Sequence, residues 1–148
     1  MKTIVSILCF FALALLGGSE AEAQGVKSSA WMKFSNGTTQ DTIATTGVDS
    51  LSYAVAKSWT GGVVQLITSR IGATTLAGTA ALWGSTDKGA TWAPVPLNGT
   101  ATAQSYTITN SVTQSTFFHV APMIYTNLRV VVTGSGSGSA KYKALLTV

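Results

Sequence analysis

Few side chains in this sequence could take part in acid–base or nucleophilic chemistry. The chain has one histidine, His119, one cysteine and five acidic residues among its 148 residues. Beyond residue 23 the cysteine is absent and the acids are three aspartates, Asp41, Asp49 and Asp87. Hydrolysis of a glycosidic bond usually takes two carboxylates that flank the bond, and nucleophilic catalysis takes a base oriented by a third group. We therefore predict that the chain is not an enzyme.

Metal and cofactor sites are not predicted either. A zinc site needs several nitrogen or sulfur ligands, and one histidine without a cysteine supplies too few. The run GSGSGS, from Gly134 to Ser139, lies between two expected strands, whereas a phosphate-binding loop leads into a helix. This run is expected to form a flexible hairpin loop. His119 stands in the strand-like stretch FFHVAP, where a packing or exposed role is expected.

The most specific short pattern is GSTDKGATW, from Gly84 to Trp92. Its aspartate and hydroxyl groups can hydrogen-bond to backbone groups of the same loop, and its second glycine can adopt a positive φ. We predict a structural turn between a strand that ends at Trp83 and one that begins near Thr91, with the Trp92 ring packed under the turn and against the core. A calcium site is not expected because only one carboxylate is near. The residues of the predicted turn are Ser85, Asp87, Gly89, Thr91 and Trp92.

This spacing, Ser-x-Asp-x-Gly-x-Thr-Trp over Ser85 to Trp92, resembles the Asp-box motif of sialidases and related β-propellers. In such proteins the motif generally forms a structural turn away from the catalytic residues. A complete propeller needs four or more blades of about 40 to 50 residues each, which exceeds the length of this chain. The resemblance therefore implies the turn and does not imply sugar cleavage.

The first 23 residues have the features of a secretory signal peptide. A lysine is followed by a largely apolar run of thirteen residues, from Ile4 to Leu16, and by small and polar residues that end in Ala21-Glu22-Ala23. This order matches a signal peptide with an A-x-A cleavage site. A permanent anchor is the alternative, although a membrane-spanning helix needs about 20 residues. We predict an export segment over 1–23, a single domain over 24–148, and no stable membrane anchor after cleavage.

The composition beyond residue 23 indicates an all-β domain. Threonine and serine make up 35 of these 125 residues, and no stretch has the apolar period of a helix. Short alternating runs are instead separated by Asn-Gly, Gly-Gly and similar turn signals. In one such run Ala30, Met32 and Phe34 share a face. About eight strands separated by turns of this kind predict one antiparallel β-sandwich of Ig-like or jelly-roll type.

The charge pattern gives no sign of a nucleic-acid partner. Eight lysines and arginines beyond residue 23 stand against three aspartates, and the basic residues are scattered along the chain. Nucleic-acid binding is typically accompanied by a basic run or by a basic patch on one element. A mild excess of positive charge more often serves solubility, so no nucleic-acid partner is predicted.

The same turn, considered as a G-S-x-D-G-x-x-W type, occurs together with a second pattern near the end of the chain. This second pattern is Y-x-R-V-x-x-T-G-x-G, and it precedes a last strand. They fall on Gly84, Ser85, Asp87, Gly89 and Trp92, and on Tyr125, Arg129, Val130, Thr133, Gly134 and Gly136. With them the chain, over about 42–148, resembles small β-sandwich proteins encoded among the virion structural genes of tailed bacteriophages. The resemblance implies a subunit that assembles with copies of itself or with other virion proteins.

Two functions remain open from the sequence. The first is a non-enzymatic structural protein of a phage virion surface, a head decoration or a tail-associated subunit, which would form homo-oligomers. The alternative is a secreted β-sandwich module that binds carbohydrate or a cell surface through exposed aromatic residues on one sheet face. The protein is accordingly expected in the virion or outside the cell. The candidates for ligand-facing aromatics, which could equally be core residues, are Trp31, Trp59, Tyr106 and Tyr125.

Overall fold

The computed structural model describes residues 28–43, 46–55, 60–97, 102–122 and 124–148. The predicted export segment lies outside these residues, as does Trp59. Within the described ranges the chain forms eleven strands and no helix. No helix that is long and apolar enough to cross a membrane is present in that part of the chain.

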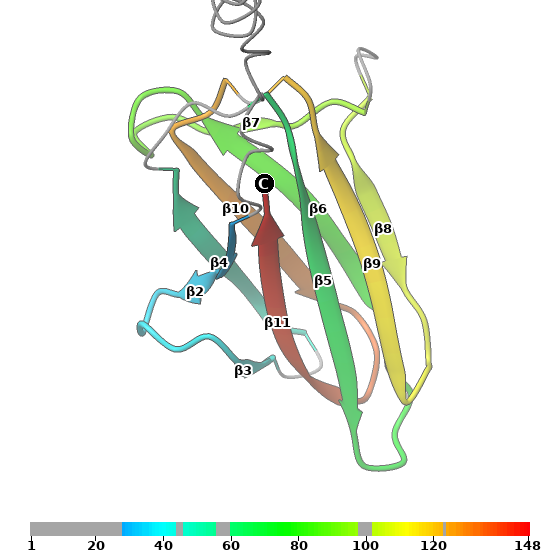
Figure 1. Cartoon of the computed structure of the whole chain (residues 1–148). Coiled ribbons are helices and arrows are strands. Elements are labelled where there is room, and N and C mark those ends of the chain that lie inside the picture. Colours follow the sequence, from blue (N-terminus) through cyan, green and yellow to red (C-terminus); the bar gives the residue numbers. More distant parts are fainter. Residues whose placement is uncertain (1–27, 44–45, 56–59, 98–101, 123) are drawn as a thin grey trace, which may run out of the picture.

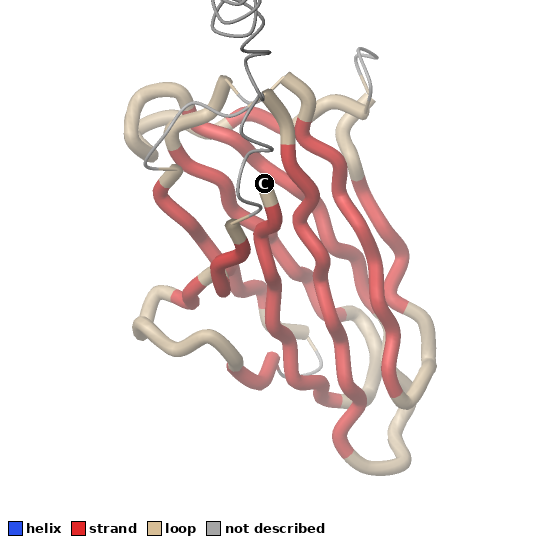
Figure 2. Tube along the Cα trace, viewed as in Figure 1, coloured by secondary structure: helices blue, strands red, loops and turns tan. Residues whose placement is uncertain are grey.

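The strands form two sheets, which Figure 1 shows as two layers, and Figure 2 shows the strands and the described loops of both layers. Sheet A has the order β1-β11-β5-β9, and β3 also pairs with β11. Its strands are β1 (Ser29–Trp31), β3 (Asp41–Ile43), β5 (Gly62–Ile71), β9 (Thr113–Val120) and β11 (Ser139–Thr147). Sheet B has the order β2-β4-β10-β6-β7, and β8 also pairs with β6. Its strands are β2 (Lys33–Phe34), β4 (Val48–Ala54), β6 (Gly78–Ser85), β7 (Ala93–Pro94), β8 (Ser105–Ile108) and β10 (Asn127–Gly134).

Every strand pair is antiparallel, so the predicted all-β antiparallel sandwich is confirmed. The sequence predicted about eight strands, and the structure has eleven in the described residues. The difference has two sources, because the structure divides the predicted run around Ala30, Met32 and Phe34 into β1 and β2, and it adds β3. A segment as short as β3 carries no measurable alternation of apolar and polar residues, so the pattern that indicates the longer strands does not reveal it.

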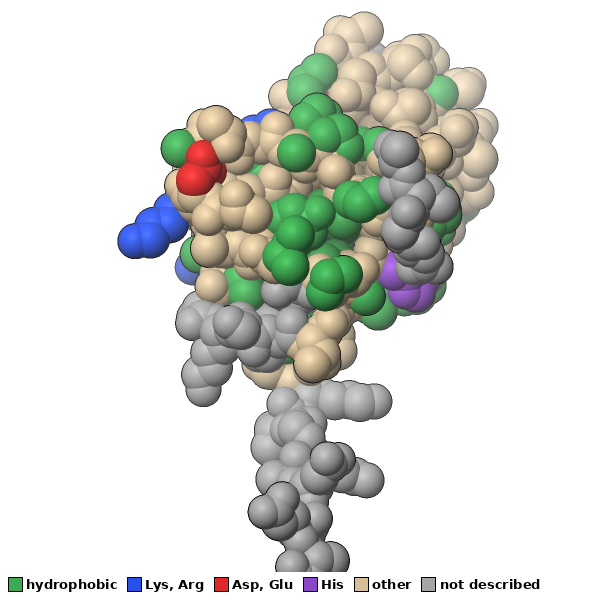
Figure 3. All heavy atoms as spheres, turned by 90° about the horizontal axis from the view of Figure 1, so that it is seen from above, with side chains coloured by type: hydrophobic (Ala, Val, Ile, Leu, Met, Phe, Trp, Pro, Cys, Tyr) green, Lys and Arg blue, Asp and Glu red, His purple; other side chains and the backbone are tan. Residues whose placement is uncertain are grey.

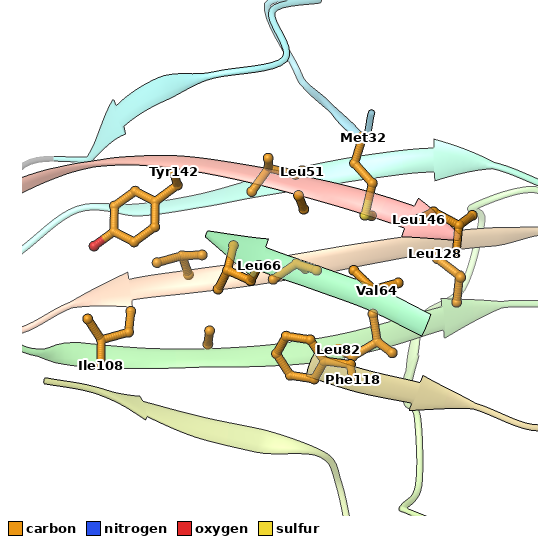
Figure 4. Packing of buried hydrophobic residues seen from close by; sticks show 14 of the residues in the cluster. Met32, Leu51, Val64, Leu66, Leu82, Ile108, Phe118, Leu128, Tyr142 and Leu146 are labelled. Atoms are coloured by element: carbon orange, nitrogen blue, oxygen red, sulfur yellow. The ribbon is translucent and has the colours of Figure 1, made fainter. Parts of the chain in front are cut away.

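The core lies between the two sheets because each long strand buries every second side chain. In β10 the alternate residues Leu128, Val130 and Val132 are fully buried, while the positions between them are partly exposed. Figure 4 shows the buried side chains of both layers pointing toward one another. The largest of them are Tyr142 and Phe118, one on each of two sheet A strands. Burial raises the pKa of the Tyr142 phenol.

The glycine-rich connection between β10 and β11 packs closely on a neighbouring loop. Its Ser135 N–H donates to the Ala77 carbonyl at 3.0 Å, and its Gly138 N–H donates to the Thr75 carbonyl at 2.8 Å. A Cβ atom added to Gly136 would lie 2.5 Å from the Thr75 carbonyl oxygen, which is closer than real Cβ atoms approach. The sequence predicted a flexible loop here. The structure instead shows glycines that allow two backbones to meet.

Candidate functional site

The turn after β6 is held by side-chain hydrogen bonds to its own backbone. The Ser85 hydroxyl donates to Asp87 Oδ1 at 2.6 Å and accepts the Gly89 N–H at 2.8 Å. The Thr91 N–H donates to the same carboxylate oxygen at 2.9 Å, and the Thr91 hydroxyl donates to Asp87 Oδ2 at 2.6 Å. Lys88 and Gly89 both have positive φ, at 59° and 91°. The Asp87 carboxylate is therefore engaged by the loop itself and is not presented as a catalytic or metal-binding group.

These hydrogen bonds hold the pKa of Asp87 well below its usual range, through the Ser85 hydroxyl first and then through Thr91. A carboxyl group whose pKa is lower in the folded state than in the unfolded state stabilises the fold above the unfolded pKa, which is about 3.9 for aspartate. This stabilisation is lost as the pH falls below that value. The turn should accordingly weaken in acid.

We expect the free energy of unfolding of the wild-type chain to fall between pH 6 and pH 3, and we expect Asp87→Asn to lose most of this dependence. Urea denaturation at the two pH values measures both. Thr86→Ala is the matched control, because the Thr86 side chain makes no hydrogen bond with the described residues, and it should keep the wild-type dependence. Equal pH dependence in wild type and Asp87→Asn would contradict the assignment.

The segment before β10 anchors this turn to the sheet. The Thr126 N–H donates to the Ser85 carbonyl at 2.8 Å, and the Thr126 hydroxyl accepts the Lys88 N–H at 3.0 Å. The ring of Tyr125 lies directly on Gly84, where an added Cβ would collide with the ring. Burial raises the pKa of the Tyr125 phenol. Tyr125, a candidate for facing a ligand, is therefore partly buried and packs against Gly84 and the edge of the core.

Trp92 lies on the outer surface of sheet B. Its ring touches the underside of the turn, since a Cβ on Gly89 would lie 3.4 Å from it, but it does not reach the core. The Arg129 guanidinium instead lies 4.3 Å from the centre of the Trp92 ring and 5.6 Å from that of Trp83. The expected core contact is therefore wrong. Trp83 and Arg129 are paired positions that face outward. Trp92 follows the turn onto the same outer face, and its ring contacts Arg129 there.

The outer face of sheet A carries a row of side chains in which both ends are aromatic. The strand registers place Trp31 beside Leu145, Leu145 beside Gln65, and Gln65 beside Phe117. Trp31 is 41% exposed and Phe117 is 46% exposed. Three strand spacings separate the two rings, which is roughly 14 Å. The outer face of sheet A, from Trp31 to Phe117, is the surface that we call the aromatic row.

The surroundings of the aromatic row are apolar and basic. Lys143 Nζ lies 5.2 Å from the centre of the Trp31 ring, which is within the range of a cation–π contact. Ile67 occupies the position across from Lys143 on β5. The Gln65 side-chain amide donates to the Ser115 hydroxyl at 2.7 Å. The lysine stem and this hydrogen bond limit the freedom of the side chains along the row.

The remaining predicted aromatics do not join this face. Tyr106 is 40% exposed, but its ring meets the edge of Phe118 in a T-shaped contact at 5.3 Å. Its register partner, Ala80, is fully buried, so Tyr106 belongs to the inner layer. Trp59 lies outside the described residues. Of the four predicted ligand-facing aromatics, the structure therefore places Trp31 on an open sheet face.

Phe117 and Arg129 are surface residues that the sequence interpretation missed as site candidates. Phe117 precedes Phe118 in the same strand, and neighbouring residues of a strand face opposite sides. With Phe118 fully buried, Phe117 has to point outward. The Phe-Phe pair in a strand-like run was therefore a usable signal. Arg129 had a comparable signal, since it interrupts the apolar run LRVVV.

The acidic residues and His119 are dispersed. Asp41 and Asp49 lie in strands β3 and β4 and accept the backbone N–H of the next residue at 2.6 and 2.7 Å. His119 is exposed, and its backbone is bridged by the Gln104 side chain, which contacts both its N–H and its carbonyl. No three His, Cys, Asp or Glu side chains among the described residues are grouped to hold a metal ion.

One end of the sandwich carries an open depression of about 380 Å³ beside His119, lined also by Gly62, Val63 and Val148. Seen along the sandwich from that end, hydrophobic side chains gather on the surface and the histidine stands at their rim (Figure 3). The depression is open and largely apolar. It lies next to the aromatic row, because Val63 and His119 are paired positions on the same outer face.

Comparisons with known proteins give weak likenesses. No protein-family model and no curated protein matches the sequence. One similar solved structure is described as "Carbohydrate-Binding Module CBM36 in complex with calcium and xylotriose", with a TM-score of 0.44 and 12% identity over 82% of this chain and 99% of that one. Another is a mutant of the family 29 carbohydrate-binding module CBM29-2 complexed with cellulohexaose, with a TM-score of 0.37 and 11% identity over 81% of this chain and 89% of that one. At these values neither structure assigns this chain a family or an activity. The resemblance to phage virion proteins stays a prediction.

Proposed function

We propose that this protein is a carbohydrate-binding β-sandwich module that holds a polysaccharide along the aromatic row of sheet A. The observation that carries the proposal is the placement of Trp31 and Phe117, each more than two-fifths exposed, in one row across the strands. Large aromatic side chains are usually buried, so two on one open face need an explanation. A ligand that covers them supplies it.

The shape of the face favours an extended ligand. The row crosses four strands, from β1 to β9, and spans roughly 14 Å between its ends, which is long enough for several linked sugars. Sugar rings have flat faces of C–H groups that pack on the electron-rich face of an aromatic ring. A small molecule would instead be expected in an enclosed pocket, with most of its surface buried.

Polar groups along the row suit the hydroxyls of a sugar. The Gln65 amide, the Ser115 hydroxyl and the Lys143 ammonium lie between or beside the two aromatic ends. Each can donate a hydrogen bond, and the amide and hydroxyl can also accept one. A platform of two rings with polar groups between them provides both the apolar and the hydrogen-bonding parts of sugar recognition.

The proposal is tested by depletion of the purified chain from solution by insoluble cellulose, xylan and chitin, followed by affinity electrophoresis through the soluble forms. We expect saturable binding to at least one of these polymers, with retention that free oligosaccharide of the same type reverses. A globular protein of similar size and charge provides the baseline. Retention no greater than this baseline for every polymer would refute the proposal.

A second candidate is self-association through the same face, as a structural subunit of a virion surface. The observation that favours it is the run of apolar side chains beside the row, Val63, Ile67 and Leu145, on one sheet face. Light scattering coupled to gel filtration distinguishes the two functions. An oligomer that Phe117→Glu converts to monomers would support assembly, whereas a monomeric wild type that binds polysaccharide supports the module.

A further inference from the structure

Arg129 occupies the middle of the opposite outer face, that of sheet B. The register places it between Ser52 on β4 and Trp83 on β6. Its guanidinium is stacked by the Trp92 ring at 4.3 Å, with the Trp83 ring at 5.6 Å. The side chain is half-buried, and its Nε atom is buried completely. The planar group is therefore held in one orientation by aromatic contacts.

The hydrogen-bonding capacity of Arg129 is unused. A guanidinium carries five N–H donors, yet this one makes no hydrogen bond or ion pair with any residue that the structure describes, and its buried Nε has no acceptor. Contact with indole rings offsets part of the loss of hydration. It does not replace the acceptors that a partly buried cation ordinarily finds. The arrangement leaves an oriented fork of donors without an acceptor.

A depression of about 330 Å³ adjoins Arg129 and is open to solvent. It is lined by Val48, Ser50 and Val131, together with Asp49 and Arg129. Asp49 stands opposite the buried Val132 in the register, and its carboxylate accepts the Ser50 N–H at 2.7 Å. Its side chain is thus at the alternate, inward position, although Asp49 also borders the depression. None of the outward positions in the described strands of sheet B holds an acidic residue.

The chemistry around the depression suits an acidic sugar. An arginine fork binds a carboxylate through two parallel hydrogen bonds. The hydroxyls of Ser50 and of the neighbouring Ser52 can bond to sugar hydroxyls, and Val131 offers apolar surface to a ring. Lys33 lies next to Ser52 in the same row and adds a second positive charge. A bare carboxylate would use the guanidinium alone.

We propose that Arg129 and the depression beside it form a binding site for a carboxylate-bearing sugar ring of the uronate class. The carboxylate pairs with the Arg129 guanidinium, and the ring rests in the depression against Val131. This site is on the opposite sheet from the aromatic row, so it does not depend on the proposed polysaccharide platform. It would select for acidic saccharides, whereas the aromatic row has no such preference built into its flat face.

The guanidinium N–H signals provide a direct test. The chain contains two arginines, Arg70 and Arg129, so a ¹⁵N–¹H spectrum of the wild-type protein has two arginine Nε–H signals. Arg70 is an internal control because its side chain already bonds to Asn110 at 3.0 Å. Titration with sodium glucuronate should move the Arg129 signal in a saturable way and leave the Arg70 signal in place. Glucose and sodium chloride should move neither.

Sodium acetate separates an acidic-sugar site from a simple carboxylate site. We expect acetate to move the Arg129 signal at least tenfold more weakly than glucuronate. Equal affinity for the two, no movement with glucuronate, or similar linear movement of both arginine signals with every salt would overturn the proposal.

Two variants connect the binding to this site. Arg129→Lys keeps the charge but removes the fork, so glucuronate affinity, followed by calorimetry, should fall at least tenfold. Because Arg129 contacts two indoles, this variant can also lose stability, and Lys33→Gln is the second variant, since it removes a charge without touching the indole contacts. Lys33→Gln should reduce glucuronate affinity severalfold at low salt and leave the melting temperature unchanged. Undiminished affinity in Lys33→Gln and in a folded Arg129→Lys would refute the site.

Discussion

Replacing Trp31 by alanine should weaken polysaccharide binding about tenfold or more, and replacing both Trp31 and Phe117 should weaken it about a hundredfold. Removing a ring that stacks on the ligand removes the apolar surface that is buried on binding. This burial contributes at least about 1.4 kcal/mol, which is a factor of ten in affinity. The two rings lie roughly 14 Å apart, and effects at that separation are usually additive.

The measurement is affinity electrophoresis in gels that contain the polymer bound by wild type. Val112→Ala is the matched control, because Val112 is a highly exposed apolar residue that lies outside the aromatic row and should not affect binding. The Trp31→Ala variant should also keep its fold, since the ring is on the surface. Unchanged retention of a folded double variant would show that the aromatic row is not the platform.

The second large effect concerns two neighbouring residues with opposite roles. Phe118→Ala should lower the free energy of unfolding by about 3–5 kcal/mol, because it removes a fully buried ring from a packed core. Phe117→Ala should lower it by less than about 1 kcal/mol, because that ring is already 46% exposed. For binding we expect the reverse order, since Phe117 and not Phe118 lies in the proposed aromatic platform.

Urea denaturation measures both stabilities, and Phe118→Leu provides a milder variant if the alanine variant does not fold. It keeps most of the apolar volume and should lose less than the alanine variant. Equal destabilisation by Phe117→Ala and Phe118→Ala would contradict the orientation of β9. A loss of polysaccharide binding in folded Phe118→Leu as large as in Phe117→Ala would contradict the separation of the two faces.

The class of the fold was predictable from the sequence because alternation is a local property. Met32 and Phe34 were placed on one face from spacing alone, and both are buried. The same period places Val64 and Leu66 on one side of β5, and these too are buried. The short strand β3 was not predictable, because three residues carry no period and the pairing of such a segment is decided by the strand beside it.

The site was predictable only in part. Trp31 was a candidate from its type and its strand, but Tyr106 and Tyr125 were candidates on the same grounds, and their rings pack against Phe118 and Gly84. What separates them is the partner across the sheet, Ala80 for Tyr106 and Gly84 beneath Tyr125. A single strand does not contain that information. Likewise, the turn residues were visible as hydrogen-bonding types, but the contact of Trp92 with Arg129 joins residues 37 positions apart in the sequence.

The sequence by itself determined that this chain forms strands, that its acids and single histidine are few, and that one side of each long strand is apolar. These are properties of residue type and of spacing within a few positions. The tertiary structure decided which apolar side faces the core, and it brought Trp31 and Phe117 into one row across four strands. It also left Arg129 between two indoles without an acceptor among the described residues. The physical reason is that register and layer packing are set by contacts between distant segments, which no local pattern encodes.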